Sequence, residues 1–231
     1  MNKVQVVFFD AGGTLFEVKG SVGEIYGRFA RRYGVERDPD VLTDNFTRSF
    51  RSQPPLAFPP GIPELHRLEW KWWRQVVLDA VSYFPGFDDY FDEVYQFFRG
   101  REAWTMFDDV IPTLSALKAQ GLRLAIVSNY DSRIDDLLCA FEIEGLFAGV
   151  HISSRIGAAK PDAAIFRAAL SYHQVEPEET IHVGDSLRED IEGAAAAGVR
   201  AVLLDRAGRF GMNDALIRIS RLDELIGARK G

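Results

Sequence analysis

Five short apolar runs, separated by segments of helical periodicity, constrain the fold of this chain more than any other feature. Amphipathic segments such as residues 110–120 and 163–170 lie between most of these runs, and Gly121 and Gly198 stand where two such segments end. Strand–helix–strand alternation produces a parallel sheet covered by helices, and strands buried on both faces are almost continuously apolar. The sequence therefore predicts an α/β fold whose strands are residues 4–9, 122–127, 150–153, 180–183 and 200–204.

The alternation is interrupted between about residues 17 and 105. This stretch has no strand signal of comparable strength, and it contains Trp70, Trp72 and Trp73, three of the four tryptophans. We expect these aromatic side chains to pack within the insertion or against the core. The pattern predicts an all-helical insertion after the first strand, with helices near residues 22–33, 41–50, 64–83 and 87–98, and a core of residues 1–16 and 106–231.

Charge and composition exclude several classes of function. The net charge of −7 argues against nucleic-acid binding, because no basic excess is present to displace counterions from phosphates. No segment approaches the ~20 apolar residues that a membrane helix needs. The single cysteine, Cys139, cannot form an internal disulfide, and its apolar neighbours suggest a small core residue. We expect a soluble cytoplasmic protein with neither nucleic acid nor membrane as a partner.

Polar side chains stand where three of the predicted strands end. Asp10 follows the first strand, Ser128 and Asn129 follow the second, and Asp185 follows the fourth. Ligands of parallel α/β sheets bind beyond the carboxyl ends of the strands. A single acid at such a position is commonly a helix cap or turn former, but the whole set indicates a site. Two further residues belong to this set, Lys160 and Asp190.

These residues make chemical sense together. Converging carboxylates need a cation, and oxygen ligands of this type suit Mg²⁺. The Ser128 hydroxyl, the Lys160 ammonium and the exposed amides of the turn at residues 11–13 suit phosphate oxygens. Phosphoryl transfer depends mainly on positioning and charge neutralisation, and aspartate can serve as its nucleophile.

Four segments, FFDAGGTLF, IVSN, GAAKPDAAIF and HVGDSLREDIEGAAAAG, resemble the four motifs of the haloacid dehalogenase-like hydrolase superfamily. The resemblance implies a doubly wound core and a helical cap, residues 17–105, that closes over a small phosphorylated metabolite. It also implies that Asp10 is the nucleophile, that Ser128 and Lys160 are catalytic, and that Mg²⁺ is the cofactor. The implied substrate-binding residues are Ala11, Gly12 and Asn129, and the implied metal ligands are Asp10, the Gly12 carbonyl, Asp185 and, through water, Asp190.

The sequence departs from the phosphatase pattern of this superfamily at Gly12, where most members carry a second Asp as general acid and base. Such proton transfer contributes about 10²–10⁴-fold in rate. Glu17, His66 and Glu102 lie in or near the insertion, but we expect each to be a surface group. His182 is expected to be structural, because strand alternation directs it away from the strand end.

Three functions therefore remain open. The first is a Mg²⁺-dependent phosphohydrolase that works through an aspartyl-phosphate and is slow or selective; a mutase is a lesser variant of it. The second is a catalytically impaired relative that binds a phosphorylated metabolite or a protein partner. The third is a 2-haloacid dehalogenase, although the Asp185 and Asp190 pattern is of the phosphatase type. We expect a monomer or a homodimer.

Overall fold

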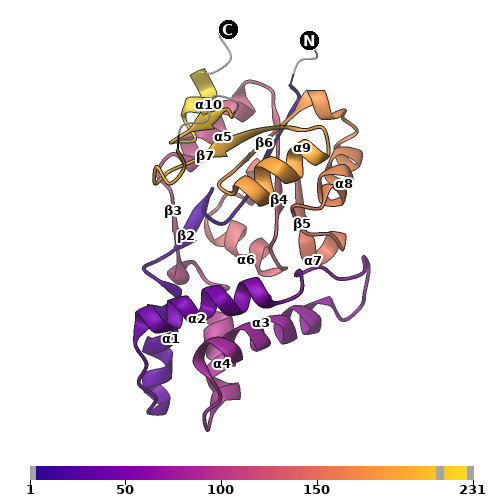
Figure 1. Ribbon diagram of the computed structural model, residues 1–231. Helices are drawn as coiled ribbons and strands as arrows, with labels where there is room; N and C mark the ends of the chain where they lie inside the picture. The colour runs from indigo at the N-terminus through magenta and orange to yellow at the C-terminus, as the bar shows by residue number, and fades with distance from the viewer. Residues whose placement is uncertain (1–3, 212–215, 228–231) are drawn as a thin grey trace.

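A six-stranded parallel sheet forms the centre of the α/β body in the computed structural model, which describes residues 4–211 and 216–227 (Figure 1). The strand order is β5-β4-β1-β6-β7-β8, so β1 lies between β4 and β6. Each predicted strand is present within two residues of its expected ends, and the sheet is confirmed as parallel. A sixth strand, β8, was not predicted, since two residues leave no periodic signal. The strands are β1 (Val6–Phe9), β4 (Arg123–Ser128), β5 (Gly149–Ile152), β6 (Thr180–Gly184), β7 (Arg200–Leu204) and β8 (Arg218–Ile219).

Helices bury both faces of this sheet. Val7 and Phe9 of β1 belong to a buried cluster with residues of α5 and α6, whereas Val6 and Phe8 belong to a second cluster with α8 and α9. Successive side chains of a strand point to opposite faces, which explains why this strand is apolar throughout. Within the described ranges no helix is long and apolar enough to cross a membrane. The helices of the core are α5 (Val110–Ala119), α6 (Arg133–Ala140), η3 (Glu144–Leu146), α7 (Ser153–Ile156), α8 (Ala163–His173), η4 (Pro177–Glu179), η5 (Leu187–Glu192), α9 (Gly193–Ala196) and α10 (Glu224–Gly227).

The insertion forms a separate helical layer, drawn below the α/β body in Figure 1. Its helices surround an aromatic-rich buried cluster of their own, in which Tyr90 and Phe91 are fully buried. The first helix begins with a capping box, in which Ser21 accepts the N–H of Glu24 and the Glu24 carboxylate accepts the N–H of Ser21. The cap helices are α1 (Val22–Ala30), η1 (Arg31–Tyr33), α2 (Pro39–Ser52), α3 (Leu65–Val81), α4 (Phe87–Phe97) and η2 (Arg101–Ala103).

The insertion is not wholly helical, which corrects the prediction for its two ends. An antiparallel ribbon of β2 (Phe16–Val18) and β3 (Trp104–Met106) joins the cap to the core. Phe16 pairs with Met106 and Val18 pairs with Trp104, so apolar side chains lie opposite one another. Each strand has three residues, too few to show alternation in the sequence. The ribbon brings together the two chain segments that enter and leave the cap.

Buried polar contacts tie the cap to the segment that follows β4. The Trp73 indole N–H donates to Asp131 Oδ2 at 2.5 Å, and the backbone N–H and guanidinium of Arg133 make three further bonds to the same carboxylate. The fully buried Glu69 carboxylate accepts both the backbone N–H and the hydroxyl of Ser132, at 3.0 and 2.9 Å. The tryptophan cluster thus packs partly against the core, as expected, and α3 contacts the loop that follows the predicted site residues Ser128 and Asn129.

Cys139 was expected in the core and is instead exposed. It lies on α6, where Leu137 and Leu138 occupy the buried stripe. A helix turns about 100° per residue, so the position after these two leucines faces outward.

Candidate active site

The ends of three neighbouring parallel strands form the site. Asp10 directly follows β1, Ser128 ends β4 and Asp185 directly follows β6, and β1 is paired with both other strands. Phe9 is in register with Ile126 and Val183, so the residues beyond these positions emerge at one edge of the sheet. This arrangement confirms that the strand ends meet.

Asp10 is almost fully buried, and one of its two oxygens is held by hydrogen bonds. Oδ1 accepts the Ser128 hydroxyl at 2.8 Å and the Lys160 ammonium at 2.6 Å. Oδ2 accepts none of the hydrogen bonds found among the described residues. Burial raises the pKa of Asp10, Lys160 opposes that rise, and the charge of Asp190 adds to it. The carboxylate is therefore oriented through one oxygen, while the other is available for reaction.

Lys160 lies between two buried carboxylates. Its Nζ is 2.6 Å from Asp10 Oδ1 and 2.6 Å from Asp190 Oδ1. Burial works against the charged ammonium, but the two carboxylates outweigh it and raise the pKa of Lys160. Asn129 fixes the backbone here, because its Oδ1 accepts the Lys160 N–H at 2.7 Å and its Nδ2 donates to the Lys160 carbonyl at 2.9 Å. The Asn129 amide thus positions Lys160, and a direct contact between Asn129 and substrate stays a prediction.

Asp190 is buried beneath the strand ends, with both oxygens hydrogen-bonded. Oδ1 also contacts His182 Nε2 at 2.8 Å, and Oδ2 accepts the Ser186 N–H at 2.9 Å. Although burial raises the pKa of a carboxyl, Lys160 and His182 hold that of Asp190 well below its usual range. Gly184 makes room for this packing, since a Cβ there would lie 2.1 Å from Asp190 Cγ.

His182 was expected to point away from the site, and its bond to Asp190 corrects that expectation. The side chain does alternate along β6 as predicted, but η5 folds Asp190 back onto the face that His182 occupies. Burial lowers the pKa of His182. Alternation along the strand alone does not predict where the segment after it will place the Asp190 side chain.

Three carboxylates converge closely enough to share a metal ion. Asp10, Asp185 and Asp190 each offer an oxygen, and these atoms lie within 4.8 Å of one another. Burial and the nearby Asp10 raise the pKa of Asp185, whose Oδ2 accepts a bond from Arg209 at 2.9 Å. Gly13 allows this approach, since it has a φ of +79° and a Cβ there would lie 2.7 Å from Asp185 Oδ2. Hard oxygen donors with excess negative charge fit Mg²⁺.

The loop after β1 leaves main-chain atoms and space beside the nucleophile. The Ala11 carbonyl accepts the N–H groups of Thr14 and Leu15, at 3.2 and 2.8 Å, and so closes the turn. The Gly12 carbonyl accepts no hydrogen bond from the described residues, which leaves it available as a ligand. A Cβ built on Gly12 would meet nothing within 4 Å. Substrate binding by the amides of Ala11 and Gly12 stays a prediction.

Two charged residues that the sequence analysis did not single out also border the site. Glu189 is partly buried; its burial and the charges of Asp10, Asp190 and Asp185 raise its pKa, against the opposing charge of Lys160. Arg209 reaches Asp185 from the segment after β7. Glu189 precedes Asp190 in the acidic motif, so its position in the sequence could have identified it as a site residue. No local sequence pattern indicates Arg209. The cap residues Glu17, His66 and Glu102 are all exposed, as expected.

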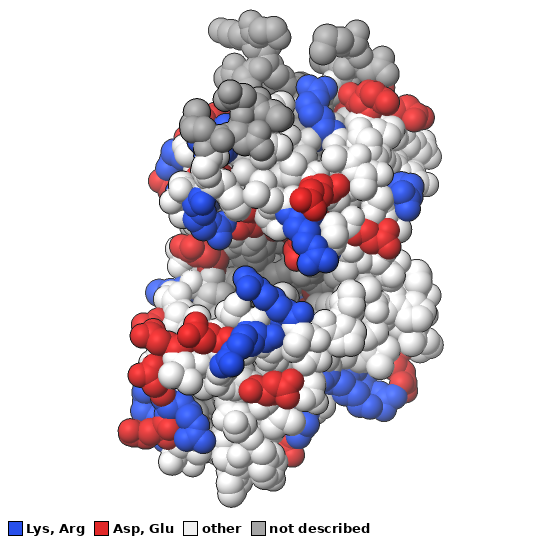
Figure 2. Space-filling model, in the orientation of Figure 1, with Lys and Arg blue, Asp and Glu red and all other residues white. Residues whose placement is uncertain are grey.

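The surface is hollowed between the α/β body and the cap (Figure 2). Lys and Arg side chains border the hollow together with Asp and Glu side chains, so both signs of charge are interspersed on this face. An anionic substrate that enters here would not meet a uniformly negative surface, in spite of the net charge of −7.

Similar sequences agree with this geometry. A sequence model of haloacid dehalogenase-like hydrolases matches residues 4–198. The chain is 31% identical over 215 residues to haloacid dehalogenase-like hydrolase domain-containing protein 3 of Mus musculus, which covers 87% of this chain and 82% of that protein. It is 38% identical over 117 residues to phosphoserine phosphatase of Thermus thermophilus, which covers 49% of this chain and 46% of that protein.

Solved structures share the fold over the whole chain. A HAD phosphatase from Thermococcus onnurineus superposes with a TM-score of 0.72 at 24% identity, and 99% of each chain is covered. A 2-haloacid dehalogenase from Pseudomonas syringae pv. Tomato DC3000 superposes with a TM-score of 0.68 at 25% identity, covering 99% of this chain and 100% of that one. The same fold thus occurs with two different reactions, and the site must distinguish them.

Proposed function

Because the chain belongs to the haloacid dehalogenase-like hydrolase family, we propose that it is a Mg²⁺-dependent phosphohydrolase that acts on a small phosphorylated metabolite. The observation that carries the proposal is the convergence of Asp10, Asp185 and Asp190 within 4.8 Å, next to the Lys160 ammonium. A 2-haloacid dehalogenase needs no such group of acids, which without a cation would repel an anionic substrate.

The donor set fits Mg²⁺, which when bound supplies positive charge to the phosphoryl oxygens. Asp185 and the Gly12 carbonyl would hold it, since each has an oxygen without a hydrogen bond among the described residues, and Asp10 would hold it through Oδ1, which keeps Oδ2 for the attack on phosphorus. Asp190 would support the ion indirectly, because Lys160, His182 and Ser186 already occupy both of its oxygens.

The residues of the chain account for two displacements at phosphorus. Asp10 Oδ2 attacks, an Asp10–phosphorus bond forms, and the ester P–O bond breaks with its electron pair leaving on the alcohol oxygen, which takes a proton from water. Water then attacks the phosphorus of the aspartyl-phosphate, and the bond between phosphorus and Asp10 breaks. The proton that the attacking water loses passes to solvent. Ser128 and Lys160 orient Asp10 through Oδ1 and would bind phosphoryl oxygens once the ester is in place.

Gly12 carries no group that transfers either proton. Only solvent is left to transfer these protons, so the rate contribution of about 10²–10⁴-fold from a positioned acid or base is lost. We therefore expect turnover to be slow or restricted to esters with good leaving groups. The enzyme would then select its substrates by the quality of their leaving group as well as by their fit to the cap.

The direct test is phosphate release from 4-nitrophenyl phosphate. We expect release that requires Mg²⁺ and is abolished in Asp10→Asn, while the exposed control Glu17→Gln keeps the wild-type rate. Equal rates with Mg²⁺ and with EDTA would exclude the proposed mechanism. Release of chloride from 2-chloropropionate in EDTA would favour the dehalogenase instead.

The absence of a side chain at Gly12 also supports a second candidate, an impaired relative that binds a phosphorylated ligand without turning it over. This candidate predicts Mg²⁺-dependent binding of a phosphate mimic and no phosphate release from a broad panel of esters. Rapid turnover of any ester in that panel would contradict it.

A further inference from the structure

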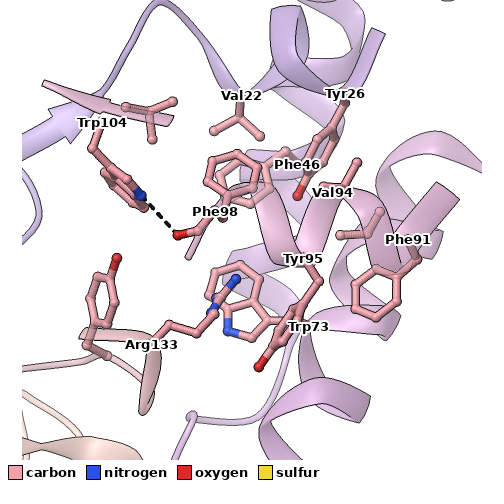
Figure 3. Close-up of a pocket in the computed structure, with 13 residues that line it drawn as sticks. Val22, Tyr26, Phe46, Trp73, Phe91, Val94, Tyr95, Phe98, Trp104 and Arg133 are labelled. Atoms are coloured by element: carbon pink, nitrogen blue, oxygen red, sulfur yellow. Dashed lines mark hydrogen bonds between the residues drawn. The ribbon is translucent and has the colours of Figure 1, made fainter. Parts of the chain in front are cut away.

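Two arginines near the site have their donors engaged by carboxylates of the protein itself. Arg133 lines an aromatic cavity of about 80 Å³ between the cap helices, the β2–β3 ribbon and the segment after β4, where Figure 3 shows it beside Trp73. Its Nε and Nη2 donate to Asp131, at 2.9 and 2.7 Å. Both terminal nitrogens of Arg206 donate to Asp109, at 2.8 and 2.9 Å. These two guanidinium groups hold the fold together and are not free for a ligand.

Arg209 differs from them because it is exposed and keeps free donors. Its Nη2 donates to Asp185 Oδ2 at 2.9 Å, and the side chain is 56% exposed. Its Nε and Nη1 make no hydrogen bond within residues 4–211 and 216–227. A guanidinium presents its N–H groups in a rigid planar fork, so these free donors can bind one further anion in a defined orientation.

The backbone that carries Arg209 is held in place. The N–H groups of Arg209 and Phe210 donate to the carboxylate of Asp205, at 2.8 and 3.1 Å, and Asp205 is 4% exposed. Arg206 ties the same loop to the nucleophile loop, because its Nη2 also donates to the Thr14 carbonyl at 2.9 Å. Only the Arg209 side chain therefore has to adjust when a ligand arrives.

Arg209 lies nearer to solvent than the residues that would hold the phosphoryl group. Asp10, Ser128 and Lys160 are 7%, 2% and 4% exposed, so a phosphoryl group bound among them is enclosed. The rest of the ester must extend outward, toward the hollow between the α/β body and the cap that Figure 2 shows. Arg209 adjoins the enclosed part through Asp185 and is itself open to solvent, so it is positioned to meet this outer part of the substrate.

Asp185 does not cancel the charge of Arg209. The contact is a single hydrogen bond, and Asp185 belongs to the three acids within 4.8 Å that would share their negative charge with Mg²⁺. A guanidinium with free donors pairs with a planar carboxylate through two parallel bonds. A second phosphate would bring about two negative charges to this one guanidinium, so a carboxylate is the closer match.

We propose that Arg209 is a specificity-determining residue that binds a carboxylate on the alcohol part of the substrate. The inference rests on the proposed phosphohydrolase function and assigns its substrate class: phosphate monoesters of small hydroxy acids. Arg209 takes no part in the bond changes at phosphorus, so it affects which ester binds and leaves the chemistry to Asp10.

The first experiment measures binding without turnover. Isothermal titration calorimetry in saturating Mg²⁺ compares 3-phosphonopropionate with propylphosphonate, which carries a methyl group in place of the carboxylate. Neither phosphonate has an ester bond to hydrolyse. We expect the wild type to bind 3-phosphonopropionate about fivefold more tightly, and Arg209→Gln to bind the two equally. Arg209→Lys, which keeps the charge without the fork, should retain a preference of about twofold.

Two controls separate carboxylate binding from other effects of the substitution. Arg200→Gln removes an exposed arginine at the start of β7, the strand end opposite to Arg209, and should keep the fivefold preference. Propylphosphonate is the internal control, because a disturbance of Asp185 or of Mg²⁺ binding weakens both ligands alike. The ratio of the two affinities therefore reports the carboxylate contact alone.

The second experiment measures kcat/KM for the phosphate ester of 3-hydroxypropionate and for propyl phosphate. We expect Arg209→Gln to lower the ratio of the two values about fivefold through KM, with kcat unchanged, because the carboxylate contact is the same in the ground state and in the transition state. A fall in kcat for both esters would indicate a structural effect and would contradict the assigned role.

The results for binding and for turnover test different claims. Absence of a preference in the wild type, absence of binding of both phosphonates, or a preference that survives in Arg209→Gln overturns the inference even if 4-nitrophenyl phosphate is hydrolysed. The expected preferences, combined with no phosphate release from any ester, support the carboxylate site and refute the proposed reaction. Should Arg209→Gln not fold, the twofold preference expected of Arg209→Lys decides.

Discussion

Restoring a carboxylate at position 12 is the perturbation that tests most of this reasoning. In Gly12→Asp the added Cβ meets nothing within 4 Å, and the left-handed φ of this loop belongs to Gly13, so the backbone accepts an L side chain. The overpacking cost of about 1–3 kcal/mol that accompanies most insertions into packed sites is therefore not expected. The new carboxylate would lie beside Asp10, where a proton must reach the leaving oxygen.

The expected gain follows from the size of general acid–base catalysis. A positioned group contributes about 10²–10⁴-fold, which corresponds to about 3–5 kcal/mol of the barrier. We expect kcat/KM for ethyl phosphate to rise within that range in Gly12→Asp. The gain for 4-nitrophenyl phosphate should be much smaller, because its leaving group departs as a stable anion without a proton.

Two controls separate proton transfer from other effects. Gly12→Ala adds the Cβ alone, and Gly12→Asn adds a side chain of the same shape that does not act as an acid at neutral pH. Mg²⁺ affinity and the urea midpoint are measured for each variant, because a fourth carboxylate near Asp10, Asp185 and Asp190 strengthens cation binding and weakens the metal-free fold. An equal gain in Gly12→Asn, or no gain with folding and Mg²⁺ binding intact, would refute the view that a proton donor is missing.

Three further outcomes follow from the same geometry. Lys160→Met leaves two buried carboxylates without their shared ammonium and should lower the free energy of unfolding at pH 7 by about 3–5 kcal/mol; an unchanged urea midpoint would contradict this. Burial, aided by the neighbouring His173, lowers the pKa of His151 to about 4 from 6.5, so the unfolded chain binds the extra proton first and stability falls as the pH drops from about 6.5 to 4. His151 alone should account for about 3 kcal/mol of the loss measured by urea unfolding at the two pH values, so the loss should be smaller in His151→Gln, and equal losses in both proteins would refute it. Gly184→Ala puts a Cβ 2.1 Å from Asp190 Cγ, so calorimetry should show Mg²⁺ affinity falling at least tenfold, and wild-type affinity would show that the turn relaxes freely.

Local patterns predicted the sheet and the residues at its rim because both depend on short-range geometry. A strand buried on two faces must be apolar along its length, and the residue that follows it must emerge at the sheet edge, as Asp10 and Asp185 do. The ribbon of β2 and β3 escaped prediction for the same reason, since three residues are too few for a period to be read. Cys139 was misplaced because one residue of helical rotation separates a buried position from an exposed one.

The sequence by itself determined which chemistry is present: an aspartate, a serine and a later acid at strand ends, a lysine and a further acid outside the strands, and a glycine where a proton donor is usual. Only the tertiary structure decided how these groups share their hydrogen bonds, because Lys160 and Asp10 are 150 residues apart in the sequence. The contact between Asp190 and His182 depends on a turn that no sequence periodicity predicts. The same holds for the aromatic cavity, whose walls come from four cap helices, the ribbon and the segment after β4. Side chains so distant along the chain meet only when the whole fold brings them together, and no local pattern encodes that meeting.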